Sequence, residues 1–150
     1  MKITGELAVR APREAVFDKL QDARFFASCV DGVNELTAID ATHYDALFET
    51  KVAYMKFSFK LTVAVTHSDR PSDIETAIEG KPLGIVGRLS ATSKTHLTQD
   101  GDDTKIAYEI DAVLTGKLGG LGQPVLRSKA KDMEKQFTAR LAESFAIPAR

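Results

Sequence analysis

Hydrophobic and polar residues alternate over most of this chain. Between Lys2 and Arg10 nearly every second residue is apolar or glycine, which is the period of a strand with one face in water. The same alternation returns between residues 33 and 115, interrupted by turn-forming Asp, Gly and Pro residues. Short connections predict antiparallel neighbours. The further strands are predicted at about 33–39, 43–52, 54–67, 73–79, 84–97 and 104–115.

Helical patterns flank this series of strands. Directly after the first strand, Pro12 suits the first turn of a short helix, and residues 22–27 predict a second one. After the glycine-rich stretch 116–122, Pro124 opens a long helix that Pro148 ends. The apolar positions of the long helix recur at steps of three and four residues: Val125, Leu126, Ala130, Met133, Phe137, Leu141 and Phe145.

Together these elements predict one α+β domain over residues 1–150, in which a curved seven-stranded antiparallel sheet wraps around the long C-terminal helix. A single helix does not fill a strongly curved sheet along its whole length. We therefore expect a cavity that binds an apolar small molecule. Its lining is expected from adaptable apolar and aromatic side chains: Phe25, Phe26, Met55, Phe57, Phe59, Ile85, Tyr108, Leu118, Leu121, Leu126, Met133 and Phe137.

Composition narrows the function classes. The chain has 150 residues, with Lys+Arg 20 against Asp+Glu 21, so its formal charge is −1 and no nucleic-acid partner is expected. Its hydrophobic fraction of 43% supports a core without disulfides. The single cysteine, Cys29, is expected to be a buried structural thiol. A secretory signal and a membrane-spanning run are both absent, which favours a cytoplasmic location.

Catalytic and metal-binding patterns are not found. The three histidines, His43, His67 and His96, lie far apart, and their spacing fits no metal motif, so we expect solvated or turn-capping roles and no cofactor. The strand carboxylates are expected to face water, which argues against acid–base catalysis; they are Glu75, Glu79, Glu109 and Asp111.

The stretch 116–122 lacks the motif of a phosphate-binding loop and is interpreted as a flexible connection. Leu118 and Leu121 are then expected to act as gate side chains of the cavity. Tyr54 or Tyr108 is a candidate donor to a ligand carbonyl. The excess of basic residues between 117 and 145 favours either a solvated helix face or weak docking on an anionic membrane surface.

Several segments, taken in order, resemble the CoxG family of carbon monoxide dehydrogenase subunits, within the START-like helix-grip, or SRPBCC, superfamily. The similar segments are Thr4-Gly5-Glu6, residues 11–17, residues 27–33, residues 84–88, residues 101–104 and residues 114–122. One difference is Asp31-Gly32, where the family usually has Pro-Gly. Longer relatives also carry a C-terminal extension with an apolar anchor, so only weak, peripheral membrane contact at the inner face is expected here.

The resemblance implies a non-enzymatic protein that holds a quinone- or lipid-like molecule. It further implies a role beside a molybdenum CO-dehydrogenase-like enzyme, in its maturation or membrane recruitment. Two alternatives stay open at this point. One is a superfamily enzyme of the cyclase or hydratase type acting on a polyketide-like substrate, which would need a polar acid–base pair in the cavity. The other is an assembly factor that acts through its surface and binds no ligand.

Overall fold

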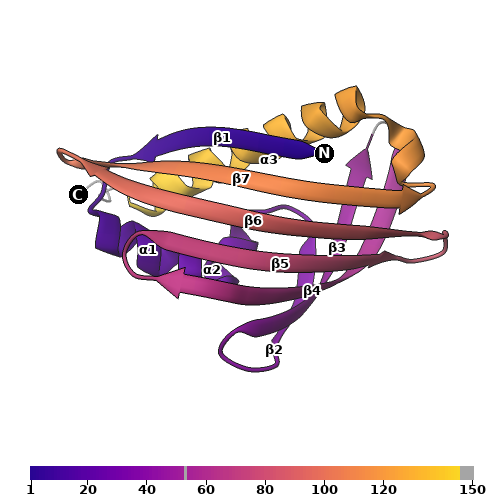
Figure 1. Cartoon of the computed structure of the whole chain (residues 1–150), viewed down its shortest axis with the longest axis horizontal. Coiled ribbons are helices and arrows are strands. Elements are labelled where there is room, and N and C mark those ends of the chain that lie inside the picture. The colour runs from indigo at the N-terminus through magenta and orange to yellow at the C-terminus, as the bar shows by residue number, and fades with distance from the viewer. Residues whose placement is uncertain (53, 146–150) are drawn as a thin grey trace.

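A computed structural model, which describes residues 1–52 and 54–145, shows one curved antiparallel sheet with the strand order β1-β7-β6-β5-β4-β3-β2. The sheet curves around α3, which runs along β1 behind the sheet (Figure 1). The predicted α+β fold class is thereby confirmed. The elements are β1 (Lys2–Val9), α1 (Arg13–Gln21), α2 (Ala23–Ser28), β2 (Val33–Ala38), β3 (His43–Val52), β4 (Met55–Asp69), β5 (Asp73–Pro82), β6 (Gly87–Asp100), β7 (Asp103–Gly116), the 3-10 turn η1 (Gly119–Leu121) and α3 (Gln123–Ser144).

Element boundaries differ from the predicted ones by a few residues. Pro12 does not lie in the first helical turn; it is extended, with φ −65° and ψ 145°, and directly precedes α1. Strand β6 begins at Gly87 rather than residue 84, because Gly84 adopts a φ of 80° within the β5–β6 connection. Pro124 lies in the first turn of α3 as predicted, and Pro148 lies outside the described residues.

The alternation of each strand decides which side chains face α3. Leu7 pairs with Ile106, and both point to the inner face. On the outer face, charged side chains form cross-strand pairs: Lys2 with Glu109 at 2.8 Å and His96 with Asp73 at 2.8 Å. The strand carboxylates therefore lie on the water side of the sheet, as the period-2 pattern predicted.

The core is divided into two separate clusters. The α1 cluster, at the end of the sheet beneath α1, contains Val9, Ala11, Val16, Phe17, Ile74, Leu97, Ile106 and Leu141. The hairpin cluster, at the end formed by the β3–β4 hairpin and η1, contains Val52, Phe57, Phe59 and Leu118. Cys29 is buried, as predicted. Two clusters at opposite ends leave the middle of the inner face to be covered by something else.

Helix α3 connects the two sides of the curved sheet. Its closest strands are β1, at one edge, and β3, beside the other edge. Leu141 is its one fully buried side chain among residues 123–144. The helix therefore spans the concave face rather than pressing onto the central strands.

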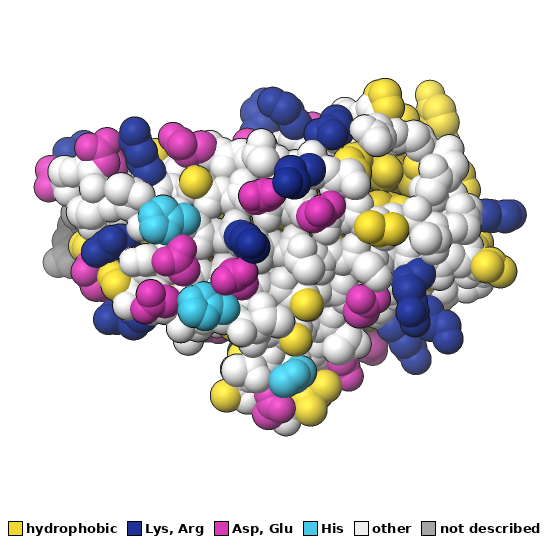
Figure 2. Space-filling model, viewed as in Figure 1, with side chains coloured by type: hydrophobic (Ala, Val, Ile, Leu, Met, Phe, Trp, Pro, Cys, Tyr) yellow, Lys and Arg dark blue, Asp and Glu magenta, His cyan; other side chains and the backbone are white. Residues whose placement is uncertain are grey.

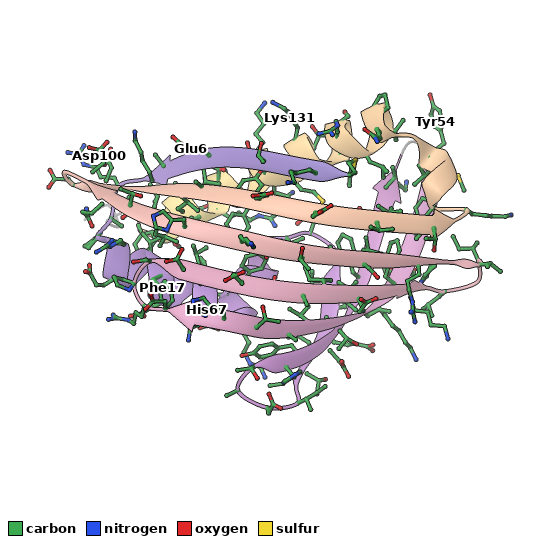
Figure 3. The ribbon with its side chains drawn as sticks, in the orientation of Figure 1. Glu6, Phe17, Tyr54, His67, Asp100 and Lys131 are labelled. Carbon is green, nitrogen blue, oxygen red and sulfur yellow. The ribbon has the colours of Figure 1, made fainter. Side chains whose placement is uncertain are left out.

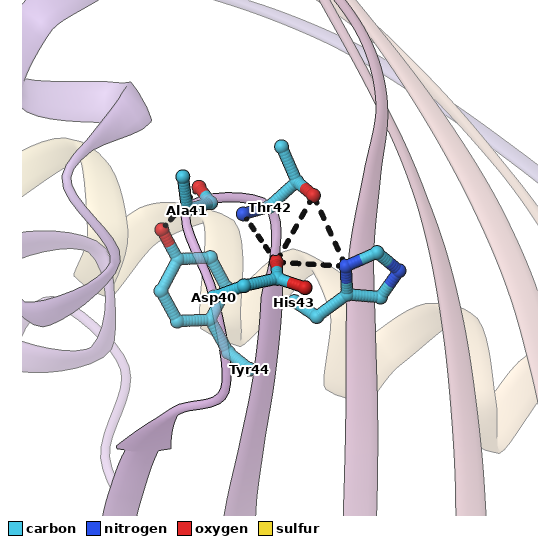
Figure 4. Close-up of polar contacts among 5 residues, drawn as sticks. All are labelled: Asp40, Ala41, Thr42, His43 and Tyr44. Carbon is cyan, nitrogen blue, oxygen red and sulfur yellow. Dashed lines mark hydrogen bonds and ion pairs between the residues drawn. The ribbon is translucent and has the colours of Figure 1, made fainter.

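A polar turn joins β2 to β3 (Figure 4). The Asp40 carboxylate accepts a hydrogen bond from the Thr42 N–H at 2.9 Å, and its Oδ1 lies 2.9 Å from Nδ1 of His43. These contacts, the Thr42 N–H first, lower the pKa of Asp40 to about 2. The predicted turn-capping role is confirmed for His43.

We expect the Asp40 carboxyl to titrate near pH 2 in the folded protein, because the folded state favours its charged form. The pKa is depressed relative to the unfolded chain, so this contribution to stability is present above about pH 4 and lost as the pH falls through about 2. A ¹³C NMR titration of the carboxyl carbons measures it. A midpoint at the ordinary value of about 3.9 would contradict the capped turn.

Candidate functional site

The middle of the inner face is only partly covered by the protein itself. Val63, Ile78 and Ile110 point inward from β4, β5 and β7, yet each stays partly exposed and belongs to neither core cluster. Apolar side chains that face inward without becoming buried mark a space between sheet and helix. The arrangement predicted from the curved sheet is therefore present at this position.

A cavity of about 250 Å³ opens where α3 faces β3. We call it the α3–β3 cavity. Phe48 and Met133 supply its apolar wall, and the charged side chains of its rim come from three different segments. Its lining consists of Val30, Asp31, Gly32, Phe48, Glu49, Thr50, Lys51, Lys129, Asp132, Met133 and Gln136.

A row of aromatic rings leads from this cavity toward the hairpin cluster. The rings of Phe48 and Phe59 are stacked with centroids 6.2 Å apart, and Phe57 continues the row at 6.2 Å from Phe59. Offset stacking of this kind presents ring faces and edges to a neighbouring flat group. The apolar wall of the cavity is thus continuous with buried aromatic surface.

The loop between α2 and β2 crosses the mouth of the cavity and is held on both sides. Toward β3, Gly32 has a φ of +90°, its carbonyl accepts the Glu49 N–H at 2.9 Å, and a Cβ there would collide with the Glu49 carbonyl oxygen. Toward α3, the Asp31 carboxylate accepts hydrogen bonds from Arg140 at 2.6 Å and Gln136 at 2.5 Å. Arg140, and after it Gln136, holds the pKa of Asp31 below its usual value.

On the other flank of α3, Tyr108 donates its hydroxyl hydrogen to the Glu134 carboxylate. Gly5 provides the space, since a Cβ at this position would collide with Oε2 of Glu134 and with the hydroxyl of Tyr108. Burial, followed by the bond to Glu134, raises the pKa of Tyr108 above its usual range. Because this hydrogen is already engaged, Tyr108 is not the free donor to a ligand carbonyl that the sequence suggested.

The predicted lining residues are distributed over three environments. Met133 lines the α3–β3 cavity. Phe57, Phe59 and Leu118 are fully buried in the hairpin cluster, against which Ile85 and Leu121 pack. Leu118 is 1% exposed and so anchors η1 instead of acting as a gate.

The remaining predicted residues lie near α1 or in water. Phe25 and Phe137 pack against the α1 cluster, and Phe26 contacts Phe137 with ring centroids 4.9 Å apart while staying 46% exposed. Leu126 is partly buried on α3. Met55 is half exposed beside the fully exposed Tyr54, which points away from the body of the protein (Figure 3).

Glu134 is the residue that sequence reasoning missed. Its charge places it with the residues of the solvated helix face, yet it lies four residues after Ala130 and three before Phe137, on the apolar stripe itself. A carboxylate in register with that stripe was the available signal.

Two absences hold for residues 1–52 and 54–145. No helix in these ranges combines the length and the apolar character needed to cross a bilayer. No group of three or more His, Cys, Asp or Glu side chains in the same part of the chain is arranged to hold a metal ion.

Comparisons with known proteins support the fold. A conserved protein from Geobacillus kaustophilus has a TM-score of 0.88 at 23% identity, covering 96% of this chain and 94% of that one. A START superfamily protein from Mycobacterium smegmatis has a TM-score of 0.71 at 11% identity, covering 95% of each chain. The Zhui aromatase/cyclase from Streptomyces sp. R1128 has a TM-score of 0.68 at 13% identity, covering 96% of this chain and 92% of that one.

At the level of sequence, no curated protein matches the chain. The model of one protein family does match, over residues 5–146. This range includes Gly5 beside Tyr108, the loop at the cavity mouth and all of α3. The chain therefore belongs to the CoxG family of carbon monoxide dehydrogenase subunits.

Proposed function

We propose that this protein is a non-enzymatic carrier that holds a hydrophobic small molecule between the sheet and α3. One observation carries this proposal: the core is split into two clusters, and inward-facing apolar side chains between them remain partly exposed beside a cavity of about 250 Å³. Burying exposed apolar surface against a guest is favourable by about 25 cal/mol per Å². An apolar guest therefore stabilises the fold that encloses it.

The chemistry of the walls supports a guest with a flat ring or an apolar chain, such as a quinone or a lipid. Phe48 offers an aromatic face, and Met133 offers a flexible thioether side chain that adapts to irregular apolar shapes. Membership of the CoxG family supports a partner as well. We infer that the carrier serves a molybdenum CO-dehydrogenase-like enzyme, in its maturation or its membrane recruitment.

The enzyme alternative has one observation to its credit, the polar pair of Tyr108 and Glu134. The aromatase/cyclase neighbour shows that this fold can house an enzyme. However, Tyr108 has a raised pKa and gives its hydrogen to Glu134, so its phenol is a poor base and a poor acid near neutral pH. The surface-acting assembly factor would be favoured by a collapsed inner space, which differs from the partly exposed wall described above.

Filling the α3–β3 cavity should abolish carriage while leaving the fold intact. Met133→Trp places a larger side chain into the apolar wall, so we expect it to weaken binding of a decyl-substituted benzoquinone by about tenfold, the equivalent of roughly 1.4 kcal/mol. Lys131→Trp, on the exposed side of α3 (Figure 3), is the matched control and should bind like wild type. Fluorescence titration measures both.

Solvent extraction of the purified wild-type protein followed by mass spectrometry provides an independent test. We expect an apolar molecule to be recovered in the extract. A protein that yields no such molecule and has no affinity for quinones or lipids would contradict the carrier function.

One end of the molecule supports contact with a membrane. Large apolar side chains are exposed on separate connections there, with Tyr54 on the β3–β4 hairpin, Val86 at 82% exposure on the β5–β6 connection and Val125 at the start of α3. The Lys117 N–H donates to the Val86 carbonyl, which places the end of β7 beside the β5–β6 connection. Figure 2 shows hydrophobic and basic side chains gathered at this end, with Asp, Glu and His mainly over the rest of the face.

The charge of this end fits an anionic bilayer. Apolar side chains on separate loop tips suit a penetrable lipid surface, and each nearby basic residue adds about 1 kcal/mol of attraction. Glu49 is paired with Lys56 at 3.5 Å. The exposed basic side chains around these tips are Lys51, Lys56, Lys81, Arg88 and Lys117.

Replacing Val86 by Asp should reduce binding to vesicles that contain phosphatidylglycerol by about threefold or more, because a carboxylate opposes both insertion and the negative surface. Ile39→Asp is the matched control, since Ile39 is also an exposed aliphatic side chain, at 58%, but lies near the β2–β3 turn. Co-sedimentation at low and high salt measures the effect. Equal binding of both variants would argue against this docking end.

A further inference from the structure

We infer that a polar belt on the inner face, formed by Thr76, Ser93, Thr95, Tyr108 and Glu134, binds a hydroxyl or amino group of the guest. The preferred guest is then a neutral amphiphile, with an apolar body and at least one hydrogen-bond donor. This inference rests on the proposed carrier function, and it adds the polar chemistry that the guest must have.

Strand register places the belt on the inner face. Thr76 lies two residues after Ile74 and pairs with Ser93, while Thr95 pairs with Tyr108. Ile74 belongs to the buried α1 cluster, so residues at even spacing from it on β5 share its face. All five belt side chains are partly exposed and lie outside both core clusters.

The belt already satisfies part of its own hydrogen-bonding capacity. The hydroxyls of Thr76 and Ser93 lie 2.5 Å apart and share one hydrogen bond. Tyr108 donates to Glu134, in the space that Gly5 leaves open. A core that only had to pack would place apolar side chains at these positions, because buried polar groups cost free energy unless they find partners.

The capacity that remains is mainly that of an acceptor. A carboxylate has two oxygens with about four acceptor positions, and one of these oxygens receives the Tyr108 hydroxyl. Within the described part of the chain, no Lys, Arg or His lies within ion-pair distance of Glu134. An O–H or N–H of the guest fits this unneutralised carboxylate, whereas an anionic head group is repelled by it.

A matched pair of probes isolates this contact. 4-Heptylphenol and 4-heptylanisole share the same apolar body and differ in a single O–H, which the anisole replaces by a methoxy group. We expect wild type to bind the phenol about tenfold more tightly, since a hydrogen bond to a charged group is worth at least that factor. 4-Heptylbenzoate, an anion of the same shape, should bind more weakly than either. Isothermal titration calorimetry measures the three affinities.

Glu134→Gln removes the charge with little change in shape, so it should reduce the phenol preference to about threefold or less. Glu143→Gln, on the exposed side of the same helix, is the matched control and should keep the full preference. Circular dichroism compares the folding of the variants. The wild-type ratio tests the inference even if Glu134→Gln lowers stability.

Two results would overturn the inference. One is equal affinity of wild type for the phenol and the anisole, which leaves the carrier function standing and removes only the belt. The other is an unchanged preference in a folded Glu134→Gln variant. Failure of all three probes to bind would instead count against the carrier function itself, and the inference would fall with it.

Discussion

One geometric constraint determines the rest of this structure: a single helix has to cover the concave face of a seven-stranded sheet. A helix is about 10 Å across, so it can contact opposite sides of a curved sheet only by spanning the space between them. Helix α3 does so between β1 and β3. The apolar residues then condense at the two ends of the sheet, where short helices or a hairpin can close it. The open middle follows from this arrangement, and so does the opportunity to bind a guest.

The two flanks of α3 are secured by polar contacts rather than by apolar packing. On the β1 flank, Tyr108 and Glu134 connect sheet and helix over Gly5. On the β3 flank, Asp31 connects the loop at the cavity mouth to Gln136 and Arg140. Asp31 stands where the family resemblance leads one to expect proline, and a proline side chain has no acceptor for those donors. Exposed hydrogen bonds of this kind are individually weak in water, so the mouth can open without disturbing either core cluster.

The periodicity of the sequence predicted most of the fold, because alternation and helical spacing directly encode which side of an element is buried. It predicted the site less well, for reasons visible in single residues. Leu118 resembles a gate residue only while its neighbours are unknown; the hairpin of β3 and β4 encloses it from afar. Glu134 resembles a solvated charge until its position on the stripe between Ala130 and Phe137 is taken into account. The clearance at Gly5 depends on three elements meeting, which no local pattern encodes.

The distribution of buried residues along α3 also indicates where a guest exchanges. Leu141, near the C-terminal end, is fixed in the α1 cluster, whereas no residue in the first half of the helix is fully buried. Gly122, directly before α3, has a φ of 86°, a conformation that glycine adopts without strain. Moving the first half of α3 therefore breaks the fewest buried contacts, and this half begins at the exposed apolar end that carries Tyr54 and Val86. Docking on a lipid surface and exchange of the guest would thus take place at the same end, so a hydrophobic molecule need not cross water between bilayer and cavity.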